Sequence, residues 1–326
     1  MPTEADLPNF HVAVLLAPGH DELVSSFWTT WPNEPVLLIG LTAAACLYGL
    51  GWSRLNRVAG GGAVTPSQAA AFFAGIIAVA LALLSPVAVY SERLFFMHMI
   101  QHLMLLLIAP PLLLLGRPLV PSLWGLPAPW RVAVGQLLVP GRPLARLGYL
   151  ITTPLIAVAA FVITIAVWHL PVFYDAAQGR SVTHDLEHLL FVGTALLYWW
   201  PVIHPAGGQR RLSYARALPY LLPPFLESML IGVLLTFAAR PLYRTYAEVA
   251  MPWGFTVVTD QQLGGLIMWI PGGMFFLIPL IGLLMALLRQ EEARSWLPVH
   301  RRAATDELRA SREQSATLVV TVTTDI

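Results

Sequence analysis

Long apolar stretches dominate this chain and limit it to one class of fold. Each approaches or exceeds the roughly 20 residues that a helix needs to cross the hydrocarbon core of a bilayer. Charged residues make up 11% of the 326-residue chain, whereas a soluble domain carries about 25%. We therefore predict an all-α polytopic membrane protein built as a bundle of seven transmembrane helices. The predicted spans cover residues 36–52, 69–90, 94–115, 150–170, 186–204, 218–239 and 262–288.

Two adjacent prolines interrupt the third predicted span. Pro110 and Pro111 fall inside it, whereas most other prolines fall in loops or at span ends. Proline lacks a backbone N–H and clashes with the preceding helical turn. We therefore expect this helix to be kinked or to end early.

The distribution of arginine predicts how the bundle is oriented. The segments 53–68, 116–149, 205–217 and 289–326 together carry 15 of the 19 basic residues, all of them arginine. Cytoplasmic loops of membrane proteins carry an excess of basic residues. We therefore predict that these four segments are cytoplasmic and that the N-terminus is extracytoplasmic.

The chain is expected to divide into three parts: an extracytoplasmic segment 1–35, a transmembrane domain 36–288 and a cytoplasmic tail 289–326. Residues 1–35 contain acidic residues and no arginine. They therefore lack the positively charged start of a secretory signal peptide.

Five histidines are predicted to lie at the extracytoplasmic ends of the spans. His98 and His102 are four residues apart at the start of the third span, His184 and His188 are spaced likewise in the HDLEH sequence, and His169 ends the fourth span. Residues four apart share one helix face. Imidazole binds metals and carries protons near neutral pH, and ionisable groups inside a membrane are costly. We predict a shared metal or proton site, although a lone histidine at a helix end is more often an interfacial hydrogen-bonding residue.

Several other side chains are secondary candidates for this site. A buried carboxylate in the sixth span must be protonated, paired or bound to a cation. Glu227 is therefore either part of a relay with Met229 or hydrogen-bonded to a neighbour such as Ser228 or Thr236. The secondary candidates are Met97, Met99, Glu227, Met229, Asp260, Gln261 and Met268. His11 and His20 are expected in a solvated segment, and His204 at the cytoplasmic interface.

The available donor atoms favour copper. The single cysteine, Cys46, lies in an apolar run, so no thiolate site is expected. Imidazole suits copper, zinc, iron and nickel, and thioether selects Cu(I). Two alternatives stay open. Opposed histidines are also suited to bind haem, and HDLEH matches the H-x-x-E-H pattern of inverzincin proteases, in which Glu187 is the base.

Three sequence blocks resemble a known family. HMIQHLMLLLIAPPLLLLGRP (98–118) looks like the signature of the CtaG family, the multi-pass assembly factors of caa3-type cytochrome c oxidase. FVGTALLYWWPVI (191–203) and DQQLGGLIMWIPGG (260–273) are similar to later blocks of that family. The motif positions that the resemblance marks are His98, His102, His188, Asp260, Gln261, Met268 and Trp269.

The resemblance implies a protein of the bacterial plasma membrane that is not an enzyme. Its implied role is to help form an active haem–copper oxidase by supplying copper to a subunit on the extracytoplasmic side. Copper is the expected cofactor. The expected partners are an oxidase subunit and membrane lipid, with no nucleic acid. The alternatives are a copper transporter and an intramembrane metalloprotease that uses HDLEH.

Overall fold

The computed structural model describes residues 27–178, 181–203, 212–246 and 256–292. Within these ranges the chain is helical and contains no strand. Six helices are long and apolar enough to cross a membrane, and a bent pair of helices makes up to seven. The predicted all-α polytopic membrane bundle is confirmed, whereas its orientation stays a prediction. His11, His20, His204 and the tail from residue 293 lie outside the described residues.

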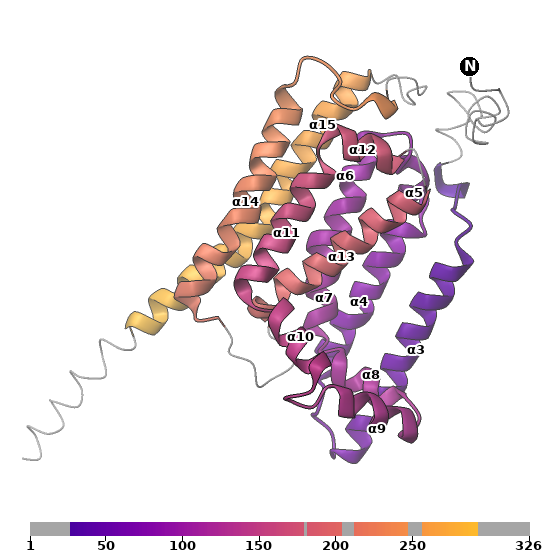
Figure 1. Ribbon diagram of the computed structural model, residues 1–326, viewed down its shortest axis with the longest axis vertical. Coiled ribbons are helices and arrows are strands. Elements are labelled where there is room, and N and C mark those ends of the chain that lie inside the picture. The colour runs from indigo at the N-terminus through magenta and orange to yellow at the C-terminus, as the bar shows by residue number, and fades with distance from the viewer. Residues whose placement is uncertain (1–26, 179–180, 204–211, 247–255, 293–326) are drawn as a thin grey trace, which may run out of the picture.

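The long helices run side by side (Figure 1). They are α3 (Pro35–Val58), α4 (Pro66–Leu83), the continuous run of α6 (Phe95–Leu103), η3 (Met104–Ile108) and α7 (Ala109–Leu115), α11 (Pro154–Trp168), α13 (Ser181–Ile203), α14 (Tyr214–Phe237) and α15 (Val257–Trp269). After a turn residue at Ile270, the span that begins with α15 continues to Glu292.

Short helices lie at the two ends of the bundle (Figure 1). One end carries α5 (Pro86–Ser91) and α12 (Pro171–Gln178), and we call it the α12 end. The opposite end, the α9 end, carries α8 (Leu119–Gly125), α9 (Ala128–Leu137) and α10 (Pro143–Ile151). The predicted orientation makes the α12 end extracytoplasmic.

The second predicted span is two helices rather than one. α4 ends at Leu83 and α5 begins at Pro86. Because proline has no N–H, the carbonyl of Ala82, four residues earlier, has no helical donor. The side-chain amide of Gln101 donates to this carbonyl at 2.9 Å. The break therefore ties α4 to α6, the helix that carries the first histidine pair.

The third span passes through its two prolines instead of ending at them. Residues Met104–Ile108 form a π-helical turn, and the helix then continues to Leu115. Pro110 and Pro111 follow Leu106 by four and five residues, so neither an α-helical nor a π-helical donor reaches the Leu106 carbonyl. The indole N–H of Trp199 on α13 donates to it at 3.2 Å. The helix therefore does not end early, and a donor from a neighbouring helix satisfies the carbonyl that the two prolines leave without a partner.

The fourth span begins later than predicted. α10 and α11 meet at a bend of 65° just before Pro154. Proline is favoured in the first turn of a helix, and it disfavours helical geometry in the residue before it. The segment 116–149, predicted to be cytoplasmic, folds largely into α8, α9 and most of α10.

Glycines let α15 pack closely against two neighbours. A Cβ at Gly265 would lie 2.6 Å from the backbone nitrogen of Thr236 on α14, and one at Gly264 would lie 2.3 Å from Cδ1 of Phe95 on α6. Small residues at such positions allow close helix packing in membranes. The start of α15 is therefore held against the start of α6.

Candidate metal centre

The first histidine pair lies in the interior of the bundle. His98 and His102 on α6 are 0% and 3% exposed, and their ring centroids are 4.0 Å apart. Four residues of helix bring the two rings onto one face, as their spacing predicts. That face is turned towards α13.

Asp260 fixes the start of the helix that carries this pair. Its two carboxylate oxygens accept hydrogen bonds from the backbone nitrogens of Phe95 and Phe96, at 2.7 and 3.1 Å. The first N–H groups of a helix lack partners within it, and a carboxylate there is favoured by the helix dipole. The N-cap residue Leu94 offers no side-chain acceptor. Asp260, on α15, thus caps α6 from another helix and acts as a positioning residue.

The second histidine pair approaches from α13. The ring centroid of His98 lies 5.7 Å from that of His184 and 6.5 Å from that of His188, and His102 lies 6.0 Å from His188. The rings of His184 and His188 are 4.2 Å apart. The structure therefore brings the two predicted pairs together from different helices. His184 is half-buried and His188 is 8% exposed.

Glu187 is the residue that completes the cluster. Its Oε1 atom lies 4.0 Å from His98 Nε2 and 3.7 Å from His102 Nε2, and the residue is fully buried. The ligand atoms of these three residues all lie within 4.8 Å of one another. Two ligand atoms at about 2.1 Å from one ion are at most about 4.2 Å apart. Small side-chain rotations therefore bring the three onto a single ion.

Sequence reasoning considered Glu187 only as the base of a protease motif. Its position three residues after His184 places it on the same side of α13 as that histidine. That spacing was the signal in the sequence by which Glu187 could have been assigned to the site. Which side chains of α6 this face meets depends on how the two helices pack.

The cluster is rich in buried polar atoms that have no hydrogen-bond partner. They include both ring nitrogens of His102, both carboxylate oxygens of Glu187, and the Nε2 atoms of His184 and His188, judged within the described part of the chain. An unsatisfied buried polar atom costs about 1–3 kcal/mol. A cation bound here would accept lone pairs from these atoms, so the donor set fits a metal ion. Such a set is uncommon in a protein interior.

Groups around the cluster orient His98. The side-chain amide of Gln178 lies 3.0 Å from His98 Nδ1. The atom at this distance is the amide nitrogen Nε2, which only donates hydrogen bonds, so Gln178 donates to Nδ1 and holds the orientation of the ring. The Tyr174 ring packs edge-on against His98 at 5.3 Å. Burial raises the pKa of Tyr174 well above its usual range, so its hydroxyl stays neutral and bonds to that of Tyr246 at 2.8 Å.

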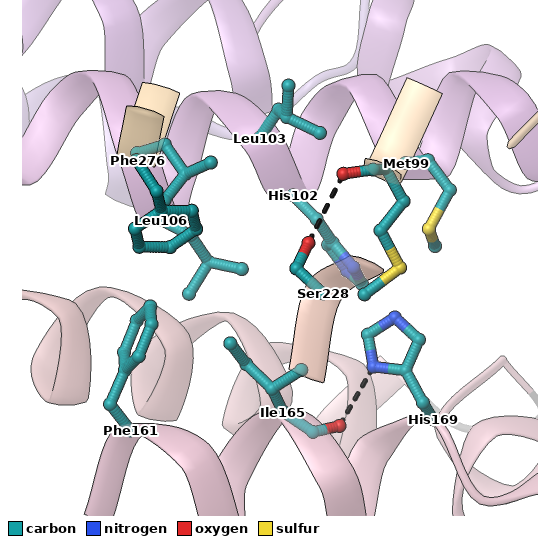
Figure 2. A pocket seen from close by; sticks show the side chains of 11 residues that line it. Met99, His102, Leu103, Leu106, Phe161, Ile165, His169, Ser228 and Phe276 are labelled. Carbon is teal, nitrogen blue, oxygen red and sulfur yellow. Dashed lines mark hydrogen bonds between the residues drawn. The ribbon is translucent and has the colours of Figure 1, made fainter. Parts of the chain in front are cut away.

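His169 occupies the other side of His102. Its ring centroid lies 6.3 Å from that of His102, and its Nδ1 atom bonds to the carbonyl of Ile165 at 2.8 Å. Tyr243 donates to the backbone carbonyl of His169 at 3.1 Å. Both imidazoles reach into a small cavity of about 30 Å³, which is also lined by Met99 and Met268 (Figure 2).

A larger cavity reaches the cluster from the α3 side. It has a volume of about 790 Å³ and lies between α3 and the helices α4, α5, α6 and α13. His184 and His188 line it together with Gln101. The lining also includes three carboxylates, those of Glu34, Glu92 and Asp185. The second histidine pair is therefore reachable from outside the bundle through an acidic opening.

The remaining predicted positions lie apart from the cluster. Met97 is half-buried and packs against the main core. Gln261 accepts from the Leu242 backbone nitrogen at 2.7 Å and donates to the Arg240 carbonyl at 3.3 Å, which anchors the segment after α14. Met229 is 41% exposed.

Glu227 does not make either hydrogen bond that the sequence suggested. The Ser228 hydroxyl donates to the Met268 carbonyl and the Thr236 hydroxyl to the Gly232 carbonyl. The Glu227 side chain is half-buried, and its Oε2 atom has no partner among the residues that the structure describes.

Comparison with known proteins gives one family for most of the chain. The profile of the family described as "Cytochrome c oxidase caa3 assembly factor (Caa3_CtaG)" matches residues 46–290. This range includes all five histidines of the α12 end, Glu187 and Asp260. No solved structure matches the chain.

Longer proteins that are similar over part of their length occur in mycobacteria. "Uncharacterized protein ML1998" of Mycobacterium leprae is 27% identical over 274 residues, which are 81% of this chain and 40% of that protein. "Uncharacterized protein Mb0105" of Mycobacterium bovis is 25% identical over 287 residues, which are 86% of this chain and 41% of that protein. The chain therefore spans about two-fifths of the length of these relatives.

Proposed function

Because the chain belongs to the family of cytochrome c oxidase caa3 assembly factors, we propose that it binds copper at the α12 end and delivers it to a subunit of a haem–copper oxidase. One observation carries the copper proposal. The ligand atoms of His98, His102 and Glu187 are buried and lie within 4.8 Å of one another, and those of His102 and Glu187 have no hydrogen-bond partner among the described residues. The role is non-catalytic, since copper is cargo rather than a resident cofactor.

The chemistry of the cluster supports copper as this cargo. Imidazole nitrogens bind copper well, and thioethers lie next to the site on the His169 side. The only cysteine, Cys46, is exposed on α3, so no thiolate competes. The carboxylate of Glu187 would partly neutralise the ion, which reduces the cost of holding a charge in a buried site.

Delivery requires that the ion can leave. His184 and His188 line the acidic cavity of about 790 Å³ beside α3, which gives an incoming ligand of the oxidase subunit a way to reach the ion. With the arginine-based orientation, this exchange takes place at the extracytoplasmic face of the bacterial plasma membrane. The partner subunit and the surrounding lipid meet the protein there.

Copper binding is tested directly on the purified protein. Wild-type protein in detergent is expected to retain copper, and the His98→Ala/His102→Ala variant is expected to lose it. Thermal unfolding of both proteins without metal checks that the variant folds. Equal copper content in two folded proteins would reject this site.

Delivery is tested in cells. Deletion of the gene should lower the copper content of the oxidase and alter its absorption spectrum, and added copper should partly restore both. Complementation with His98→Ala/His102→Ala should fail where the wild-type gene succeeds. An oxidase that is fully loaded with copper in the deletion strain would contradict the delivery role.

Two alternatives make different predictions. A transporter would accumulate copper in sealed proteoliposomes, whereas we expect none. In the described part of the chain Glu227 belongs to no group of three His, Cys, Asp or Glu ligands, and Met229 is 41% exposed. A protease would lose cleavage in a Glu187→Gln variant. Oxidase maturation that survives this change would exclude proteolysis as the function.

A further inference from the structure

We propose that the small cavity between α6, α11 and α15 is a second copper site, specific for Cu(I), formed by His102, His169, Met99 and Met268. The inference builds on the proposed function, because His102 also belongs to the cluster with His98 and Glu187. It goes further by assigning a separate, thioether-containing site to residues that approach His102 from its other side (Figure 2).

The hydrogen bonding of His169 prepares it as a ligand. A carbonyl oxygen only accepts hydrogen bonds, so the 2.8 Å contact with the Ile165 carbonyl means that His169 Nδ1 carries the proton. The other nitrogen, Nε2, then has a free lone pair. It is buried and has no partner among the described residues. Ligating histidines commonly show this arrangement, with one nitrogen held by a backbone carbonyl and the other bound to metal.

The spacing of the two imidazoles suits one ion between them. A metal–nitrogen distance of about 2.1 Å puts an ion roughly 3.2 Å from each ring centroid, so two ligating rings lie about 5–6.5 Å apart. The centroids of His102 and His169 are 6.3 Å apart. The cavity of about 30 Å³ holds a single ion, since one water molecule needs only about 10–15 Å³.

The remaining potential ligands are soft and uncharged. Met99 and Met268 line the cavity and are 1% and 6% exposed. No carboxylate lines it within the described ranges. Thioether selects Cu(I), and a neutral ligand set in an apolar setting disfavours the higher charge of Cu(II). The cluster with Glu187 and this cavity therefore differ in the copper chemistry that they favour.

The shared residue links the two sites. Both ring nitrogens of His102 are buried without partners in the described structure. Its imidazole can therefore bind an ion on the Glu187 side or on the Met side. Cu(I) passing between the sites exchanges ligands around one imidazole, with no change of oxidation state.

X-ray absorption of the full-length protein loaded with Cu(I) under anaerobic conditions tests the second site. Wild-type protein should show copper–sulfur scattering and hold Cu(I) in competition with a Cu(I) chelator. Met99→Leu/Met268→Leu should lose the sulfur scattering and bind Cu(I) more weakly. Leucine nearly conserves the volume of methionine, so the packing is preserved. His169→Ala should also weaken Cu(I) binding and reduce the sulfur scattering.

The matched control is Met229→Leu/Met274→Leu, which changes two methionines that are 41% and 54% exposed and should leave both signals intact. Wild-type copper that is bound only by nitrogen or oxygen, or sulfur scattering that survives Met99→Leu/Met268→Leu, overturns the second site and leaves the proposed function standing. Wild-type protein that binds no copper overturns both.

Discussion

The starts of α13 and α15 are both polar and both buried at the α12 end, but they differ in how their side chains are satisfied. On α15, Asp260 accepts two backbone N–H groups, and Gln261 bonds to two backbone groups. On α13, Glu187 and His188 have buried atoms with no partner within the described chain. Because unsatisfied polar atoms are costly, the start of α15 stabilises the fold, whereas the start of α13 holds unsatisfied atoms that a bound cation would satisfy.

The largest expected effect is a difference in copper affinity between variants of these two regions. His98→Ala/His102→Ala removes the two imidazoles that face Glu187, so affinity for Cu(I) should fall by at least about 100-fold, or about 2.7 kcal/mol. Competition with a Cu(I) chelator measures this change. Asp260→Asn is the contrasting variant, and it should retain most of the affinity. A larger loss of copper affinity in Asp260→Asn than in His98→Ala/His102→Ala would contradict this difference between α13 and α15.

The next effect concerns the stability of the metal-free protein. Asp260→Ala leaves the N–H groups of Phe95 and Phe96 without their charged acceptor, and we expect a loss of about 2 kcal/mol. Asp185→Ala, which removes an exposed carboxylate on α13, should change stability by less than about 0.5 kcal/mol. Chemical unfolding in detergent measures both. Equal losses would show that Asp260 does not act as a cap.

A smaller effect is expected for the carboxylate inside the cluster. Glu187→Gln keeps the side-chain shape and removes the charge, so copper affinity should fall about tenfold. The stability of the metal-free protein should hardly change, because the carboxylate makes no hydrogen bond that would be lost. Glu227→Gln on α14 is the matched control and should alter neither property. Strong destabilisation by Glu187→Gln would show that Glu187, like Asp260, stabilises the fold.

The smallest effect is on the rate of copper loading. Glu34→Gln/Glu92→Gln removes two carboxylates from the opening beside α3, and loading should slow by about two- to threefold at low ionic strength. The final affinity should stay the same, and the rate difference should disappear in high salt. Stopped-flow mixing with Cu(I) measures the rate. A rate that does not depend on these charges would indicate another route to the cluster.

The sequence predicted the helices better than their ends. Apolar length alone located the spans, because a helix in lipid must satisfy its backbone internally. The breaks at Pro86 and Pro154 and the continuity through Pro110 were harder to predict. A side chain from another helix donates to the carbonyl that proline leaves without a donor both at the break, where Gln101 reaches Ala82, and in the continuous span, where Trp199 reaches Leu106. These contacts join residues that are far apart in the sequence, so no local pattern predicts them.

The sequence also located the histidines without giving their grouping. Spacing by four residues placed each pair on one helix face, and the structure brings those faces together. The separation of His169 from the cluster, and its pairing with Met99 and Met268, followed from no local pattern. In the sequence Asp260 and Glu187 look alike, because each is an acidic residue near the start of a predicted span.

The sequence by itself determined that this chain is a helical membrane bundle with imidazoles near one end, because apolar length and helical spacing are local properties. Only the tertiary structure decided which polar groups are hydrogen-bonded and which are left with free lone pairs. That outcome depends on what each side chain meets on the neighbouring helix. Asp260 meets two backbone donors on α6, and Glu187 meets two imidazoles there.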